Sequence, residues 1–506
     1  MNNRLLYWSV TCALAGFIFG FDLSVTSGVE QKIQSLWSLS AGQHGFAMSA
    51  AFWGTVLGAL LGGFPTERWG RRRTLLCIGI FYFVSAIGSA LAPNVGVFTL
   101  ARFLGGIGIG VSTVAAPLFI SEISPADRRG RLTGMFQFNI VLGLLIATLS
   151  NFAIIKILGE GNEGAWRWML GVEAFPALLY SVLCFKLPES PRWLIVQGRR
   201  EEGKEVLRQI NPRFDGEELE EKVAEIEESA RLRPAEPGGI GSRLKLPILL
   251  AFLIAFFNQL SGINAILGFA PRIFGLTGID TSASLFYASL ITLTNLVFTF
   301  VGLWLIDRLG RRTLLYIGSF GYIISLGICA WAFHTYQAQF SNAAAAMDLK
   351  NNAAEVLSGE VALNGPAEFM ERIPESVEAA EEFAEAEIVK AKEGSGTGGV
   401  IVLGCIIGFI AAHAVGQGAV IWVFISEIFP ARARSFGQSL GSGTHWVFAA
   451  LLTLFFPIAM AKLSPSVIFG FFCFMMVLQL VWVKLMVPET KGVSLEKMEE
   501  NLGSGR

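Results

Sequence analysis

The feature that most constrains this chain is a series of apolar segments, each about 20 residues long, that recurs along most of its length. A run of that length crosses the ~30 Å hydrocarbon core of a bilayer as one α-helix. Charged residues make up 16% of the chain and hydrophobic residues 53%. Soluble domains carry a charged fraction of about 25%. The pattern therefore predicts an all-α polytopic membrane protein.

We expect twelve membrane spans in two sets of six. The first set is placed at 5–27, 45–65, 74–93, 98–120, 133–156 and 169–187, and the second at 247–270, 283–306, 313–334, 398–424, 437–460 and 466–487. Basic residues cluster after the second, fourth, eighth and tenth spans, for example at Arg68, Arg128, Arg308 and Arg432. The positive-inside rule then predicts that this side and both termini are cytoplasmic.

Short motifs recur in the same order in both halves of the chain. RWGRR at 68–72 returns as RLGRR at 308–312, and ISEISP around Glu122 returns as ISEIFP around Glu427. Such a repeat is typical of two related six-helix bundles. The expected domains are 1–187, a cytoplasmic helical linker at 188–246, the second bundle at 247–487 and a cytoplasmic tail at 488–506. An acidic, Ala- and Glu-rich insertion at 335–397 is expected on the non-cytoplasmic side, as amphipathic helices or a partly disordered segment.

One predicted span, 257–274, is unusually polar and reads FNQLSGINAILGFAPRIF. Its amide and hydroxyl groups would be costly against lipid, so they are expected to face protein or a water-filled cavity. Gly262 and Pro271 weaken the helix, as is common where a span bends at a binding site. The alternative is that these polar groups only hold neighbouring helices together.

Seven motifs in register resemble those of the sugar porter family of the major facilitator superfamily: GGFPTERWGRR, ARFLGGIGIG with SEISPADRRG, PESPRWL, NQLSGINA, DRLGRR, SEIFPARAR and PETKG. The resemblance implies two six-helix bundles that rock around a central site and open it alternately to each side. It also implies a transporter of a monosaccharide, which binds through amide hydrogen bonds and indole stacking. The residues that would bind the sugar are Phe19, Gln137, Asn258, Gln259, Asn264, Asn295, Gly418, Trp422, His445 and Trp446.

Three features of this site depart from the family pattern. Asn258 stands where a glutamine is usual, and Gly268 and Phe269 stand where two tyrosines are usual. His445 stands where Asn or Gln is usual, and it could instead be a core histidine bonded to a neighbour. These exchanges are expected to alter the choice of substrate.

The resemblance further implies ion pairs that close the cytoplasmic side in the outward-facing state. Arginine forks pair well with carboxylates, and both are matched between the two halves. The alternative is that these arginines are only topology anchors. The residues of this group are Glu67, Arg68, Arg71, Arg72, Glu122, Arg129, Asp307, Arg308, Arg311, Arg312, Glu427 and Arg434.

Asp22 is an ionisable residue inside the first span, which is a functional signal by default. In the family, a carboxylate at this place beside an arginine accompanies proton-coupled import, and Arg102 is the expected partner. Protonation of Asp22 would alternate with pairing to Arg102 and so link proton occupancy to conformation. The alternative is a static ion pair between spans 1 and 4.

The leading prediction is sugar/proton symport into the cytoplasm, by a monomer in the cell membrane, such as a bacterial inner membrane. The alternatives are a passive facilitator of a sugar or of an inositol-like polyol, and, more remotely, a transporter-like nutrient sensor. No enzymatic activity, metal site, cofactor or nucleic-acid partner is expected. The glycines of GGIGIG lie within a span, where they allow close helix packing rather than forming a phosphate loop.

Overall fold

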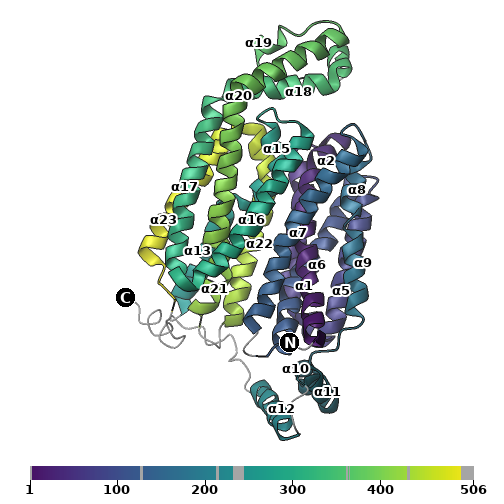
Figure 1. Cartoon of the computed structure of the whole chain (residues 1–506), viewed down its shortest axis with the longest axis vertical. Helices are drawn as coiled ribbons and strands as arrows, with labels where there is room; N and C mark the ends of the chain where they lie inside the picture. The colour runs from purple at the N-terminus through teal and green to yellow at the C-terminus, as the bar shows by residue number, and fades with distance from the viewer. Residues whose placement is uncertain are drawn as a thin grey trace.

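The computed structural model describes residues 3–125, 129–211, 216–231, 244–359, 363, 365–429 and 434–491. Its regular structure over these residues is entirely helical, and the helices form two bundles that stand side by side (Figure 1). The first bundle contains α1 (Asn3–Val25), η1 (Thr26–Gly28), α2 (Glu30–Leu36), α3 (Ala41–Leu61), α4 (Gly63–Arg68), α5 (Arg71–Ala90), α6 (Val95–Ile123), α7 (Arg129–Leu158), α8 (Ala165–Gly171) and α9 (Ala174–Cys184).

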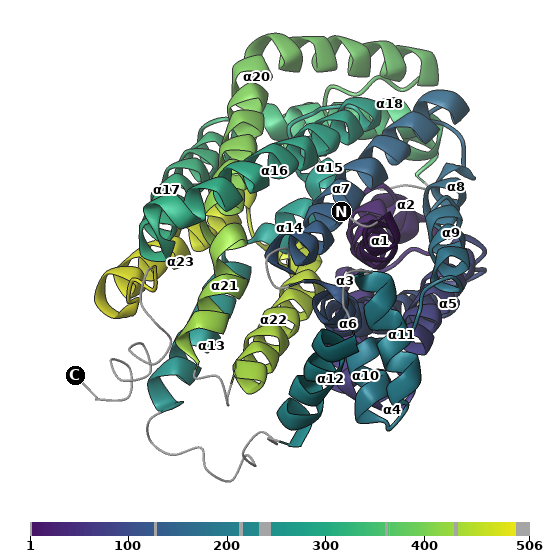
Figure 2. The ribbon, with the colours of Figure 1, turned by 60° about the horizontal axis from the view of Figure 1, so that its bottom comes forward.

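The second bundle contains α13 (Lys245–Leu260), α14 (Ile263–Gly268), α15 (Ala270–Gly275), α16 (Thr281–Leu309), α17 (Arg311–Thr335), the later part of α20 (Val377–His413), the π-helix η4 (Ala414–Gly418), α21 (Ala419–Ile428), α22 (Arg434–Lys462) and α23 (Pro465–Met486). Viewed from the end that carries the N-terminus, α22 lies beside the first bundle and α17 and α23 lie away from it (Figure 2). The core is made of residues from both bundles, because one continuous apolar cluster contains Phe21, Met48, Phe269 and Phe456.

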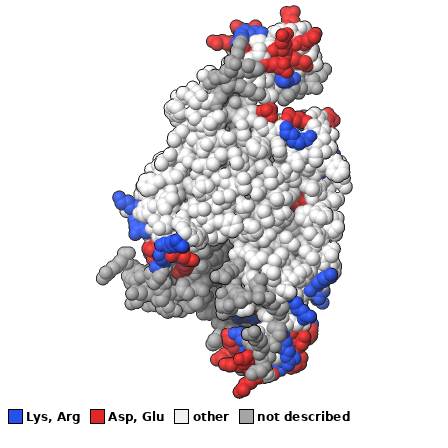
Figure 3. Space-filling view, in the orientation of Figure 1, with Lys and Arg blue, Asp and Glu red and all other residues white. Residues whose placement is uncertain are grey.

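The surface confirms a chain built to cross a membrane. In the face drawn in Figure 3, Lys, Arg, Asp and Glu gather at the two ends and leave an almost uncharged band between them. Eleven helices of the described residues are long and apolar enough to span a bilayer. Many large apolar side chains within them are exposed, such as Leu60, Trp304 and Phe474. A lipid-facing surface requires this pattern, because no water is present to favour polar side chains.

The predicted span 169–187 is present, but it is not one continuous helix. It is built from α8 and α9, which are separated at Val172 and Glu173. Pro176 explains the break, because its ring clashes with the carbonyl of the residue four positions earlier and it has no N–H to donate. The break places the Glu173 carboxylate in the interior, with 1% of the residue exposed.

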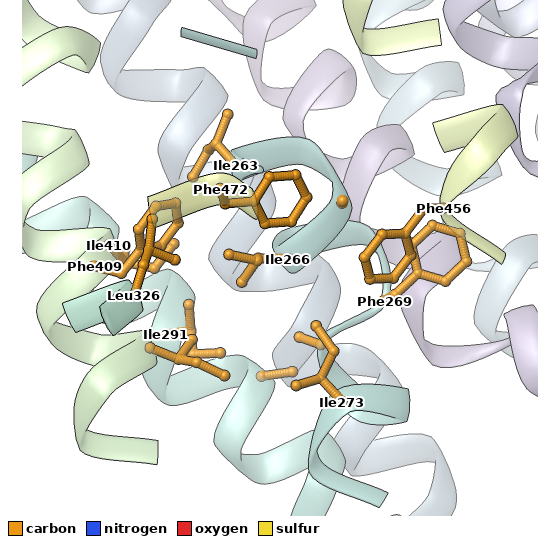
Figure 4. Packing of buried hydrophobic residues seen from close by; sticks show 14 of the residues in the cluster. Ile263, Ile266, Phe269, Ile273, Ile291, Leu326, Phe409, Ile410, Phe456 and Phe472 are labelled. Carbon is orange, nitrogen blue, oxygen red and sulfur yellow. The ribbon is translucent and has the colours of Figure 1, made fainter. Parts of the chain in front are cut away.

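The polar span at 257–274 is broken twice, as its glycine and proline predicted. α13 ends at Leu260, α14 runs from Ile263 to Gly268, and α15 begins at Ala270. Gly262 has φ +88°, and a Cβ there would lie 2.6 Å from the Phe472 ring. Ile263 and Phe472 lie next to one another beside this turn, and Phe269 packs on Phe456 with ring centroids 5.0 Å apart (Figure 4). The polar side chains beside the first break, Asn258, Gln259 and Ser261, are buried.

Two additional helical segments lie outside the bundles, at opposite ends (Figure 1). α10 (Pro191–Val196), α11 (Arg200–Ile210) and α12 (Gly216–Arg231) lie at the end that carries the N-terminus. α18 (Gln337–Ser358), α19 (Ala367–Met370) and the first part of α20 form a projection at the other end, with a small core that includes Leu349 and Phe369. The helical alternative for the insertion is therefore correct over the described residues, whereas most of the predicted tail, 492–506, lies outside them.

Candidate functional site

A polar network centred on Gln259 occupies the interface between α13, α14 and α22. Gln259 is fully buried at the end of α13, and its amide oxygen accepts a hydrogen bond of 2.8 Å from the Asn264 amide. Its amide nitrogen lies 3.2 Å from Asn258 Oδ1 and 3.1 Å from His445 Nε2. One glutamine side chain thus orients three of the predicted sugar-binding groups.

Aromatic rings surround this network on the side of α22. The His445 ring lies between two indoles, with centroids 5.2 Å from Trp422 and 4.8 Å from Trp446. Trp446 reaches the first bundle, where its ring lies 5.6 Å from Phe19 and 6.3 Å from Phe52. The cluster therefore combines amides, which both donate and accept, with apolar ring faces, which suits a neutral polyhydroxylated ligand.

Three other predicted binding residues lie on the surrounding helices. Gln137 is half-buried on α7, and Asn295 is buried on α16, where its Oδ1 accepts from Thr299 at 3.5 Å. Gly418 ends the π-helix η4, one turn before Trp422. Within the described part of the chain, no hydrogen bond joins Gln137, Asn295 or Gly418 to the Gln259 network.

The Asp22–Arg102 pair forms as the resemblance implied. Arg102 donates to both carboxylate oxygens of Asp22, at 2.6 and 3.0 Å, and to the Asp22 backbone carbonyl at 2.9 Å. Asp22 is fully buried on α1, and 3% of Arg102 is exposed on α6. A bidentate pair with an additional backbone bond is strong and geometrically defined.

A cavity of about 80 Å³ touches the ion pair and the polar network at one residue each. Arg102 forms part of its wall from the first bundle, and Asn264 forms part of its wall from the second. Gly268 and Phe269, two of the exchanges noted in the sequence, lie on the same wall. A ligand in this cavity would touch both bundles, as a substrate must if it is to bias their relative positions.

Sequence reasoning missed Glu173, which lies close enough to Asp22 and Arg102 to interact electrostatically with both. Its two carboxylate oxygens are buried without a hydrogen-bond partner among the described residues. The first bundle therefore holds a second buried carboxyl group near the Asp22–Arg102 pair. The signal was present, because Glu173 lies in a predicted span, as Asp22 does.

The matched arginines form equivalent ion pairs at the end of the molecule that carries α10–α12. Arg71 donates to both oxygens of Glu122 at 2.9 and 2.8 Å, and Arg311 donates to both oxygens of Glu427 at 3.1 and 2.8 Å. Each pair joins two helices of the same bundle.

The remaining residues of the predicted gating group are placed differently. Arg72 and Arg312 donate to the backbone carbonyls of Phe185 and Lys484, at 2.7 and 2.8 Å. The other side chains lie at the surface or outside the described part: Asp307 lies 3.5 Å from Arg311, Glu67, Arg68 and Arg308 are exposed, and the side chains of Arg129 and Arg434 are not described.

The repeated PES and PET motifs complete this arrangement through contacts that the sequence did not indicate. Glu189 and Glu489, from the PES and PET motifs, accept hydrogen bonds from the backbone N–H groups that begin α5 and α17. Gly70 and Gly310 precede these helices with φ +91° and +87°. A Cβ at either glycine would lie within 2.5 Å of the glutamate side chain. The pseudo-symmetry thus extends to the backbone at the helix ends.

Comparison with known proteins gives a consistent result. The model of a family described as "Sugar (and other) transporter" matches residues 8–349 and 384–502. A galactose–proton symporter of Escherichia coli is 29% identical, covering 98% of this chain and 93% of that protein. A major myo-inositol transporter of Bacillus subtilis is 29% identical, covering 96% and 92%. The inward-open structure of a xylose transporter from E. coli superposes with a TM-score of 0.73 at 25% identity, covering 98% and 99%.

Proposed function

We propose that this chain, which belongs to the sugar (and other) transporter family, is a secondary active transporter that imports a monosaccharide together with a proton. The observation that carries the proposal is the buried Asp22–Arg102 pair, whose guanidinium lies on the wall of the cavity that also touches Asn264. A proton site and a sugar site that share one cavity can each respond to the occupancy of the other.

The binding step follows from the chemistry of the site. The amides of Asn258, Gln259 and Asn264 can each donate to and accept from sugar hydroxyls. Trp422 and Trp446 supply apolar faces for a pyranose ring. No charged side chain belongs to this network among the described residues, so a neutral ligand fits better than an ionic one. The transporter needs no cofactor, because the proton gradient supplies the driving force.

The coupling step follows from the ion pair. When Asp22 is ionised, Arg102 holds it, and α1 stays fixed to α6. A proton on Asp22 removes the charge that this geometry satisfies and weakens the pair. Glu173 provides a second carboxylate near Arg102, which can compensate the guanidinium when Asp22 is protonated. Proton occupancy thereby changes the relative stability of the conformations.

The orientation follows the basic residues of the sequence. We place the end that carries α10–α12, and both termini, in the cytoplasm, and the α18–α20 projection on the outer side. With this orientation in the cell membrane, we divide the chain after residues 187, 246 and 487 into a first bundle, a cytoplasmic linker, a second bundle and a cytoplasmic tail. The protein is proposed to act as a monomer, since the two bundles of one chain together form a complete site.

A passive carrier of an inositol-like polyol is the second candidate, and the similarity to a myo-inositol transporter favours it. Uptake into proteoliposomes with an imposed pH gradient distinguishes the two. Hexoses, pentoses and polyols are screened one at a time. Symport predicts accumulation above the outside concentration only while the outside is more acidic. Uptake that stops at equal concentrations would instead indicate facilitation.

The cytoplasmic ion pairs give a further prediction. Glu122→Gln removes the charge that satisfies Arg71 and is expected to shift the population toward the inward-facing state. A membrane-impermeant probe applied from outside should then react more slowly, by about fivefold, with a thiol placed in the cavity. Glu160→Gln, in the exposed loop after α7 at the other end of the first bundle, controls for the loss of one negative charge. An unchanged reaction rate in Glu122→Gln would refute the gating role.

A further inference from the structure

An ion pair joins the two bundles at the end opposite α10–α12. Glu30 lies on α2 of the first bundle, and Arg272 lies on α15 of the second. The Arg272 Nε is 2.9 Å from Glu30 Oε1, and its terminal nitrogen NH2 is 2.6 Å from Glu30 Oε2. Glu30 is 1% exposed and the Arg272 side chain is 22% exposed, so the carboxylate is buried and the guanidinium is half-buried. The pair is a bidentate contact of the kind that fixes orientation as well as distance.

Two further side chains of the first bundle complete the cluster. Gln34, one turn after Glu30 on α2, accepts from Arg272 NH2 at 2.7 Å. His44 of α3 is fully buried, with its Nε2 3.2 Å from Glu30 Oε2. Burial raises the pKa of the Glu30 carboxyl, but Arg272 and His44 outweigh that effect and hold the pKa below its usual value. The carboxylate is therefore charged when the bundles are in contact.

This contact differs from the other buried ion pairs of the described residues. Asp22–Arg102 and Arg71–Glu122 stay within the first bundle, and Arg311–Glu427 stays within the second. Among the ion pairs of the described residues, Glu30–Arg272 alone crosses from one bundle to the other. Any motion that separates the bundles at this end must break it.

The breaks in the seventh span connect this pair to the cavity. Arg272 lies on the short helix α15, which begins directly after Phe269. Phe269 forms part of the cavity wall, and its ring lies 6.0 Å from His44 and 5.0 Å from Phe456. Phe269 on the cavity wall is therefore only three residues from Arg272, the arginine that pairs with Glu30 on α2.

We propose that Glu30, Gln34, His44 and Arg272 form an outer latch that holds the two bundles together above the cavity and must open before substrate enters from outside. In the closed state each charge of the pair is satisfied only by its partners, and in the open state water satisfies both. Removing Arg272 leaves the Glu30 carboxylate buried without its guanidinium, which is strongly unfavourable. Removing Glu30 leaves the half-buried Arg272 guanidinium without its carboxylate, which is also unfavourable. Neutralising either residue therefore destabilises the closed state and shifts the population toward the outward-open state.

The test uses thiol labelling in right-side-out vesicles without sugar or a proton gradient, so it does not depend on the identity of the substrate or on symport. Met48 lies on the cavity wall, and Met48→Cys provides the reporter. The full chain without Met48→Cys gives the background from its own cysteines. Glu30→Gln and Arg272→Gln, each combined with the reporter, are expected to raise the labelling rate by at least about tenfold.

Two comparisons make the result specific. Arg167→Gln also removes a positive charge from this end, but Arg167 bonds to the carbonyls of Ala90 and Ala92 in its own bundle. Its labelling rate should stay within about twofold of the reporter protein. The double variant Glu30→Gln/Arg272→Gln should label no faster than the single variants, because one contact can be lost only once. Unchanged rates in the single variants, or effects that add in the double variant, would overturn the latch.

Discussion

Asp22→Asn is expected to abolish accumulation of sugar against a gradient while leaving exchange of sugar across the membrane intact. Asparagine has the shape of aspartate and keeps one oxygen as an acceptor for Arg102, but it cannot take up or release a proton. Under an inward gradient of about one pH unit, a transporter that moves one proton with each sugar can accumulate the sugar roughly tenfold. The variant should reach a ratio of about one, which is the equilibrium value for passive flow. Accumulation in proteoliposomes measures the first property, and counterflow of labelled sugar measures the second.

Asp280→Asn is the matched control for this experiment. Asp280 caps α16 by accepting from the Ala283 N–H at 2.8 Å, and asparagine is an equally good cap. The control should accumulate sugar as the unmodified protein does. If Asp22→Asn still concentrated sugar under the gradient, proton coupling would have to be assigned to another group. Loss of counterflow together with accumulation would mean that the ion pair is needed for structure, as in the static alternative.

The architecture was largely predictable because its causes are local. The apolar runs, the basic residues between them and the repeated motifs each follow from a short stretch of sequence. Gly262 and Pro271 also predicted a broken seventh span, and the breaks occur beside them. The break before α9 has an equally local cause in Pro176, but the hydropathy of 169–187, which located the span, does not indicate it. The insertion is less separate than expected, because its Ala- and Glu-rich part favours helix and continues directly into the tenth span as α20.

The site was predictable only where a motif specified it. Asp22 and Arg102 are 80 residues apart, and their pairing could be expected only from the family resemblance. The bond between Gln259 and His445 spans 186 residues and joins two positions that had been selected separately. The outer latch spans 242 residues, and no local pattern indicates it. Glu30 and Arg272 each resemble an ordinary polar residue at the outer end of a span until the fold brings them together.

The ion pairs at the two ends of the molecule have different roles. The ion pairs at the α10–α12 end act within one bundle, whereas the latch at the other end acts between bundles. Glu122→Gln and Glu30→Gln should therefore change outer accessibility in opposite directions on the same reporter. A sugar bound in the cavity and a proton bound at Asp22 can each shift the equilibrium between the conformations that these ion pairs bias.

Gln259→Leu is expected to have the largest effect on sugar binding. Leucine is close to glutamine in volume, but it cannot hydrogen-bond, so Asn258, Asn264 and His445 would lose their common partner. Buried polar groups without partners cost about 1–3 kcal/mol each, and the sugar would meet amides that are no longer held in place. The sugar concentration for half-maximal exchange should rise at least about 100-fold, which corresponds to ~2.7 kcal/mol.

The pattern of losses separates this effect from that of Asp22→Asn. Gln259→Leu should reduce accumulation and counterflow together, because both require bound sugar, whereas Asp22→Asn should remove accumulation alone. Gln479→Leu is the control, since Gln479 is also a fully buried glutamine, bonded to Gln417 and Ser319 instead of the predicted sugar-binding amides. Thermal unfolding of both variants measures the general cost of replacing a buried amide. If Gln259→Leu kept its apparent affinity for sugar while it lost as much stability as Gln479→Leu, Gln259 would be a structural residue and the sugar site would have to be formed by other residues.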